Sequence, residues 1–111
     1  MSGGSDLFTG TLDILILKAL AGGPRHGYAI GKWIRDRSSE VLTIGEGVLY
    51  VALRRLAKKG LTTASWGETE TGRRARFYSL TAAGQQTLAE ERLRWVEYSD
   101  AVRTLLDSPE G

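Results

Sequence analysis

Three arginines, Arg73, Arg74 and Arg76, stand together in a polar stretch of the chain. They belong to residues 25–80, which hold eleven of the fifteen lysines and arginines but only five of the thirteen acids. The remainder of the chain is net negative. Concentrated positive charge favours phosphate binding, because neutralising a phosphate backbone releases condensed counterions. The chemistry that these residues predict is phosphate recognition, and nucleic acid is the expected partner.

Groups for catalysis or metal binding are scarce. The chain has no cysteine and a single histidine, His26, so one subunit cannot supply the three or four nitrogen and sulfur ligands of a zinc site. Acids between Glu90 and Asp100 alternate with arginines at helical spacing, which indicates an ion-paired solvent face rather than acid–base catalysis. The sequence also lacks a phosphate-binding glycine loop. We therefore expect no enzymatic activity, no metal and no cofactor.

The elements that position the basic residues follow from the pattern of apolar side chains. Helical spacing predicts four helices, at residues 9–21, 26–37, 46–59 and 82–106. Residues 61–66 and 75–80 are rich in β-branched and aromatic side chains and predict two strands, joined by the polar loop 67–74. Three helices followed by a basic hairpin is the order of a winged helix-turn-helix. In that fold one helix enters the major groove of DNA, while the hairpin reaches an adjacent groove or the backbone.

The predicted fold class is α+β, mainly α with a small β-hairpin: a winged helix-turn-helix plus one long C-terminal helix. The expected segments are a flexible N-terminus (1–8), a winged-helix DNA-binding domain (9–80), a C-terminal dimerisation helix (81–107) and a tail (108–111). The longest apolar run, residues 12–20, is interrupted by Asp13 and Lys18, and residues 1–6 lack the basic start of a secretory signal. We expect no membrane span and a cytoplasmic protein.

The predicted third helix has two faces of different character. Leu49, Leu53 and Leu56 form an apolar stripe, whereas the opposite stripe is polar and basic and suits the major groove. The hairpin arginines suit phosphates or a narrow minor groove, and a tyrosine hydroxyl suits a phosphate hydrogen bond. A merely solvated hairpin and half-buried tyrosines are the alternatives. The expected DNA contacts are Tyr28, Gly47, Tyr50, Val51, Arg54, Lys58, Arg73, Arg74 and Arg76.

Short motifs recur along the chain in an informative order. They are Gly10–Asp13, Gly23–Pro24, His26–Ile30, Glu46–Tyr50, Leu53–Leu56, Gly60–Leu61, Gly72–Tyr78 and Leu80–Gly84. In order and spacing they resemble the PadR-like transcriptional regulators, over about residues 9–84. The resemblance implies a dimeric bacterial repressor with an N-terminal winged helix. The short C-terminal part of this chain resembles the compact branch of the family, which has a single dimerisation helix there.

Two positions depart from the family pattern. Val51 stands where the family usually has proline. Unlike proline, valine has a backbone N–H, and it places two methyl groups on the groove-facing stripe, within reach of a thymine methyl. Trp33 stands at a position that is usually polar in the family. We expect the operator preference to differ from that of relatives, and Trp33 to provide a contact surface of its own.

The last predicted helix carries a seam for a second subunit. Leu88, Trp95 and Val102 are seven residues apart, the repeat of packed helices. The expected dimer interface is Leu88, Trp95, Tyr98, Val102, Leu105 and Leu106. Trp95 either packs in this interface or stacks on a planar or cationic ligand. Because some PadR-like regulators place an aromatic residue here in a ligand site between subunits, the resemblance makes Trp95 and Tyr98 candidate contacts of a planar aromatic or cationic effector.

The expected function is therefore a homodimeric DNA-binding regulator. DNA binding is predicted by the charge pattern and by the resemblance to PadR-like regulators. Repression, a pseudo-palindromic double-stranded operator and release by a small-molecule effector are implied by the resemblance alone. The alternative is a winged-helix module that uses the same basic face for a protein or RNA partner without sensing an effector.

Overall fold

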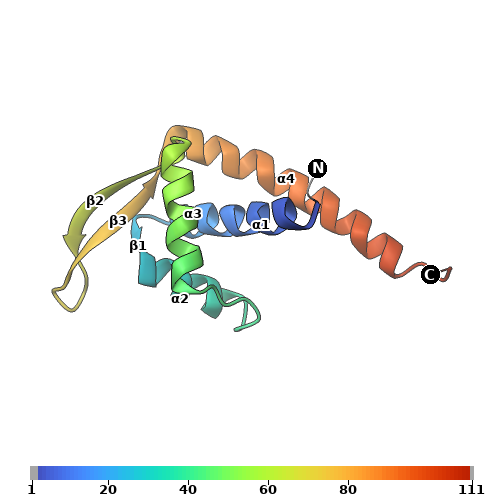
Figure 1. Ribbon diagram of the computed structural model, residues 1–111, viewed down its shortest axis with the longest axis horizontal. Helices are drawn as coiled ribbons and strands as arrows, with labels where there is room; N and C mark the ends of the chain where they lie inside the picture. Colours follow the sequence, from blue (N-terminus) through green and yellow to red (C-terminus); the bar gives the residue numbers. More distant parts are fainter. Residues whose placement is uncertain (1–2, 111) are drawn as a thin grey trace.

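The architecture is a winged helix-turn-helix with a long helix attached. A computed structural model describes the backbone of residues 3–110 and the side chains of residues 10–110. Its elements are α1 (Gly3–Leu20), β1 (Arg25–His26), α2 (Gly27–Arg37), α3 (Glu46–Lys58), β2 (Thr62–Glu68), β3 (Arg74–Leu80) and α4 (Ala82–Leu106). Figure 1 shows the hairpin β2–β3 projecting at one end of the molecule and α4 extending toward the other. The α+β fold class and the helix that follows the winged helix are as predicted.

The first helix is longer than the apolar pattern indicates. α1 begins at Gly3, so residues 3–8, which the sequence assigns to a flexible N-terminus before a helix at Thr9, are helical. Met1 and Ser2 lie outside the described residues. A helix extends at low cost once later turns are anchored, because each added residue contributes a hydrogen bond without a new nucleation penalty.

The sheet contains a strand that the sequence does not predict. Its order is β1-β3-β2, and the two residues of β1 pair antiparallel with Tyr78 and Phe77 of β3. A two-residue strand has no periodicity of its own and forms because β3 offers a free edge. The hairpin is also longer than predicted, since Gly67 and Glu68 still pair with β3. Its turn therefore shortens to residues 69–73, where Gly72 takes a positive φ of 81° that favours glycine.

The core is built around α1. This helix contacts α2, α3, α4 and β3 (Figure 1). The fully or almost fully buried side chains are Leu12, Ile16, Leu17, Ala19, Leu20, Ile30, Ile34, Leu49, Ala52, Leu53 and Leu56. Burial of these apolar groups is the main favourable term that holds the three helices together. α3 is thereby fixed with its leucine stripe inward and its opposite face outward.

The start of α4 is attached by close backbone packing to the segment between α3 and β2. The Thr81 hydroxyl accepts a hydrogen bond from the Gly84 backbone N–H and donates one to the carbonyl of Gly60 at the end of α3. Gly84 is buried, and a Cβ there would collide with the backbone carbonyl of Leu61. Only glycine fits this approach without a shift of the backbone. α4 consequently leaves the winged helix in a set direction, along α1.

Candidate nucleic-acid interface

α3 presents the predicted polar face to solvent. Its stripe of Leu49, Leu53 and Leu56 is buried in the core, as expected. The predicted contact residues of this helix are all exposed: Gly47, Tyr50, Val51, Arg54 and Lys58. This face is thus free to meet a partner, whereas the leucine face is committed to the fold.

Two neighbouring arginines of α3 have different environments. The side chain of Arg55 points to α1, where its Nε and Nη2 both donate to the carboxylate of Asp13, with Nε 3.3 Å from Oδ2. Arg54, one residue earlier, is exposed and has no ion pair among the described residues. Arg55 therefore joins α3 to α1, and only Arg54 retains all its donors for a ligand.

Tyr50 leans from α3 onto the start of α2. A Cβ built on Gly27 would lie 2.5 Å from the Tyr50 hydroxyl and 2.8 Å from its ring carbon Cζ, so the close approach requires glycine at this position. The tyrosine remains 41% exposed. Burial of its ring end, with smaller contributions from Tyr78 and Glu46, raises the pKa of Tyr50 above its ordinary value. The hydroxyl therefore keeps its proton near neutral pH and is available as a hydrogen-bond donor.

His26 organises the first turn of α2. Its Nδ1 accepts a hydrogen bond of 3.3 Å from the Ala29 backbone N–H, so the imidazole caps the helix. The ring also stacks on Tyr28, with centroids 6.4 Å apart, and meets the edge of Phe77 at 5.3 Å. The imidazole thus fixes the first turn of this helix. Tyr28 is 67% exposed beside it.

The hairpin, which we call the wing (β2, β3 and residues 69–73), exposes all three predicted arginines. On its face that turns toward the helices, the guanidinium carbon of Arg74 lies 4.7 Å and that of Arg76 5.6 Å from the ring centroid of Trp66. None of Arg73, Arg74 and Arg76 forms an ion pair among the described residues. Sequence reasoning missed Trp66, although an aromatic residue in a short exposed hairpin was a visible signal.

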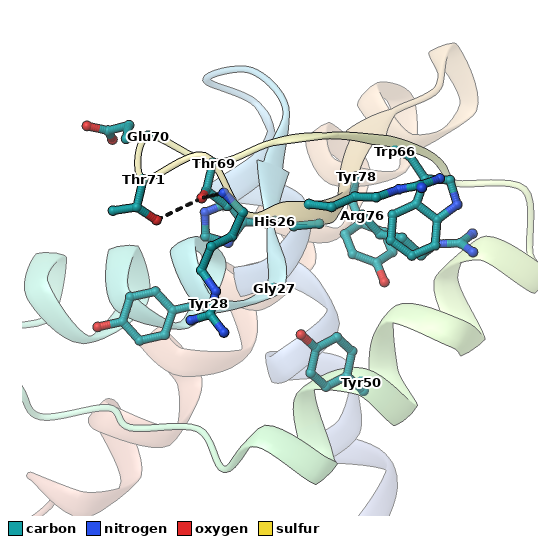
Figure 2. A pocket seen from close by; sticks show the side chains of 13 residues that line it. His26, Gly27, Tyr28, Tyr50, Trp66, Thr69, Glu70, Thr71, Arg76 and Tyr78 are labelled. Atoms are coloured by element: carbon teal, nitrogen blue, oxygen red, sulfur yellow. Dashed lines mark hydrogen bonds between the residues drawn. The ribbon is translucent and has the colours of Figure 1, made fainter.

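A cleft joins these elements into one site. It has a volume of about 720 Å³ and lies between the start of α2, the side chain of Tyr50 and the inner face of the wing. Figure 2 shows Tyr50 on α3 facing Tyr78, Trp66 and Arg76, with Tyr28 and His26 at the other end of the opening. Of the predicted contacts, Tyr28, Tyr50 and the three wing arginines line it. Gly47, Val51, Arg54 and Lys58 lie outside it on α3.

The residues predicted for a dimer interface fall into two groups. Leu88 packs against the core of its own subunit, and the indole N–H of Trp95 donates a 3.1 Å hydrogen bond to the Thr11 hydroxyl on α1. Val102 is half-buried. Tyr98, Leu105 and Leu106 are exposed, and Leu93 and Val96, which the seven-residue spacing did not include, are exposed as well. α1 thus covers part of the predicted seam, and α4 retains apolar side chains that its own subunit leaves uncovered.

Trp33 has a role within the chain. The ring packs against the hydrophobic core, and the guanidinium carbons of Arg25 and Arg37 lie 5.8 and 6.0 Å from its centroid. Arg25 also donates a 2.8 Å hydrogen bond from Nε to the carbonyl of Ala19 at the end of α1. This cluster fastens α2 to α1, and Trp33 does not line the cleft.

Comparison with known proteins identifies this arrangement. The model of the transcriptional regulator PadR-like family matches residues 16–90. The chain belongs to the PadR-like family of transcriptional regulators. A solved transcriptional regulator from Clostridium thermocellum is 33% identical, with a TM-score of 0.79 over 91% of this chain and 95% of that one. A PadR family regulator from Eggerthella lenta is 31% identical, with a TM-score of 0.75 over 96% of this chain and 91% of that one. A PadR family regulator from Clostridium difficile is 30% identical, with a TM-score of 0.73 over 86% of this chain and 97% of that one.

The PadR-like assignment agrees with the motifs on which the resemblance was based, and the compared regulators share nearly the full length of the chain. Within the described part of the chain, no helix combines the length and the apolar character that crossing a membrane requires. No cluster of three or more potential His, Asp or Glu metal ligands occurs among the same residues.

Proposed function

We propose that this PadR-like regulator is a homodimeric cytoplasmic repressor that binds a pseudo-palindromic DNA operator and leaves it when a small molecule binds. One observation carries the DNA-binding part: Arg54 and Lys58 on α3 and the three arginines of the wing are all exposed, on adjoining elements. In the described residues, Arg54, Lys58 and the wing arginines form no ion pair with an acid. Unpaired cations retain their full attraction for phosphates, and each phosphate contact releases a counterion.

The two elements are suited to different parts of the duplex. α3 has the diameter that fits the major groove, where Arg54 can donate to the guanine acceptors and Val51 can contact a thymine methyl. The wing suits the adjacent backbone or minor groove, because its arginines line the cleft and form no ion pair among the described residues, although Glu70 lines the same cleft. Tyr50, Tyr28 and the N-terminus of α2 lie between them and suit a phosphate, which would set the register of α3 in the groove.

Dimerisation is supported by the apolar side chains that α4 leaves exposed. Leu105 and Leu106 are 74% and 79% exposed in the single subunit, and Tyr98 and Val96 are about half exposed. Exposed apolar side chains on one helix mark an interaction surface, and Tyr98 and Leu105, which are seven residues apart and both exposed, suit a second copy of the helix. A two-fold dimer would place its recognition helices on half-sites about 34–36 Å apart or a multiple of this distance.

The effector part of the proposal concerns Trp95 and Tyr98. The hydrogen bond to Thr11 fixes the indole of Trp95, yet 40% of the residue remains exposed beside the dimer surface. A planar aromatic or cationic molecule could stack on such a ring. To release DNA, the molecule must bind more tightly to a dimer whose two recognition helices are spaced wrongly for the operator. A molecule with equal affinity for the DNA-binding and the non-binding dimer would not shift the population of either. Fluorescence titration of the wild type and of Trp95→Ala measures this binding; a quenching response that persists in the variant assigns the ligand elsewhere.

The test of DNA binding is a titration of labelled duplex from the upstream region of the protein's own gene, followed by fluorescence anisotropy. The expected anisotropy result is tight binding that weakens steeply with salt. Footprinting of the same duplex should show a two-fold symmetric protected region. A single-stranded RNA of the same sequence is the matched probe. The basic face alone would also suit RNA or an acidic protein. If the protein bound the RNA more strongly than the duplex, or bound the upstream duplex no better than an unrelated duplex, the alternative function as an RNA- or protein-binding module would be favoured.

A further inference from the structure

The wing contains an aromatic residue whose exposure is unusual for packing. Trp66 lies directly opposite Arg76 in the β2–β3 register, and Arg74 lies two residues away on the same face. The indole is 58% exposed, so it contributes little to the core. Its ring has the guanidinium carbons of Arg74 and Arg76 at 4.7 and 5.6 Å from the centroid. One ring therefore holds two arginine side chains.

The way in which the arginines are held leaves their donors free. A guanidinium attracted to an aromatic face makes this contact through its plane, whereas its five N–H groups point outward from the edge. The contact of Arg55 with Asp13 is the contrast within the same chain, because there Nε and Nη2 are occupied by the carboxylate. Glu68 pairs with Arg74 in the strand register, but no ion pair joins them. Trp66 thus orders two cations without neutralising them.

Ordering of this kind matters for binding a phosphate backbone. Arginine has a long side chain with high rotamer entropy, and binding must remove that entropy when the side chain is immobilised. An arginine that already lies along an aromatic ring loses less rotamer entropy when it binds a phosphate. Arg74 and Arg76 both line the cleft that also contains Tyr50 and the start of α2, and Figure 2 shows Arg76 beside Trp66 there. The two arginines therefore border the space where a phosphate backbone would run.

We propose that Trp66 is a positioning residue for DNA binding: it holds Arg74 and Arg76 in the orientation in which they bind backbone phosphates, and it does not itself contact DNA. This inference rests on the proposed function. It distinguishes Trp66 from Trp33, whose ring also lies near two arginines but packs against the core outside the cleft. It also assigns the wing a preformed pair of phosphate ligands rather than two independent flexible cations.

The experiment compares Trp66→Leu and Trp66→Phe in duplex anisotropy titrations at several salt concentrations. Because Trp66 orders both arginines before DNA binds, its loss adds the cost of immobilising two side chains to the binding step and should weaken affinity about five- to thirtyfold. Phenylalanine keeps an aromatic face and should restore most of the affinity. The salt slope should stay unchanged in Trp66→Leu, because both arginines still reach phosphates, whereas Arg74→Ala should lower the slope by about 1. Trp33→Leu is the control and should leave DNA affinity unchanged.

A double-variant cycle separates positioning from direct contact. In a chain that carries Arg74→Ala and Arg76→Ala, Trp66→Leu should cause no further loss of affinity. A further loss there would mean that Trp66 touches DNA, and equal affinities of wild type and Trp66→Leu would mean that it positions nothing; either overturns the inference. Thermal unfolding of each variant identifies any that fail to fold, and Trp66→Phe then carries the comparison within the same cycle. A wild-type protein that binds no duplex would overturn the proposed function and this inference together.

Discussion

Replacement of Gly27 by alanine is expected to weaken DNA binding without unfolding the protein. The added Cβ would lie 2.5 Å from the Tyr50 hydroxyl, 2.8 Å from Cζ and 3.0 Å from Cε1, so the tyrosine must move. What moves is the far end of a side chain that is 41% exposed, and alanine is a better helix former than glycine. The free energy of unfolding should therefore change by no more than about 1 kcal/mol.

The cost should appear in the affinity for DNA. If the Tyr50 hydroxyl donates to a phosphate, its loss removes a hydrogen bond to a charged group, worth about 1.5–3 kcal/mol. Each 1.4 kcal/mol is tenfold, so binding should weaken by about ten- to a hundredfold. Tyr50→Phe removes the same hydroxyl and should have the same effect. Because both changes remove one contact, the combination of Gly27→Ala with Tyr50→Phe should be no weaker than either alone.

Duplex anisotropy titration at fixed salt measures these effects, with thermal unfolding of the same samples. Gly31→Ala is the matched control, because it lies on the same helix and its Cβ would make an ordinary 3.8 Å contact with Leu49 Cδ2. This variant should bind DNA as the wild type does and be slightly more stable. Unchanged affinity in Gly27→Ala would refute the placement of Tyr50 at a phosphate, and so would additive losses in the double variant.

Three further results are expected. Arg54→Ala should cost about 1–3 kcal/mol and relax sequence preference, whereas Arg74→Ala should weaken all sequences alike and reduce the salt slope by about 1; identical profiles in titrations against operator and random duplex would contradict the division between α3 and wing. Leu105→Asp should convert the dimer to monomers in sedimentation, because a buried unpaired charge costs several kcal/mol, and a monomeric wild type would refute the interface. Gly84→Ala should lower the thermal midpoint through its collision with the Leu61 carbonyl, with overpacking costing about 1–3 kcal/mol; an unaltered midpoint would mean that the backbone there yields freely.

Elements with a strong apolar repeat could be predicted from the sequence alone. The leucine stripe of α3 predicted both the helix and the face that it buries, since residues three and four apart share a side of any α-helix. The exposed cations opposite this stripe followed from the same geometry. β1 and the first turns of α1 could not be predicted in this way, because their hydrogen bonds depend on a neighbouring strand or on the turns that follow, and not on a local pattern.

The sequence by itself therefore determined the helices, the hairpin, the basic character of the central segment and the PadR-like motifs. Only the tertiary structure decided what adjacent or distant residues do with their charges. The helical position of Arg54 predicted its exposure, but nothing in the sequence indicated that its neighbour Arg55 is bound to Asp13, which lies far from it along the chain. Likewise Trp66 became the support of two arginines only through strand pairing. The physical reason is that ionic and aromatic contacts depend on distances of a few ångströms, which folding sets between segments whose sequences carry no record of each other.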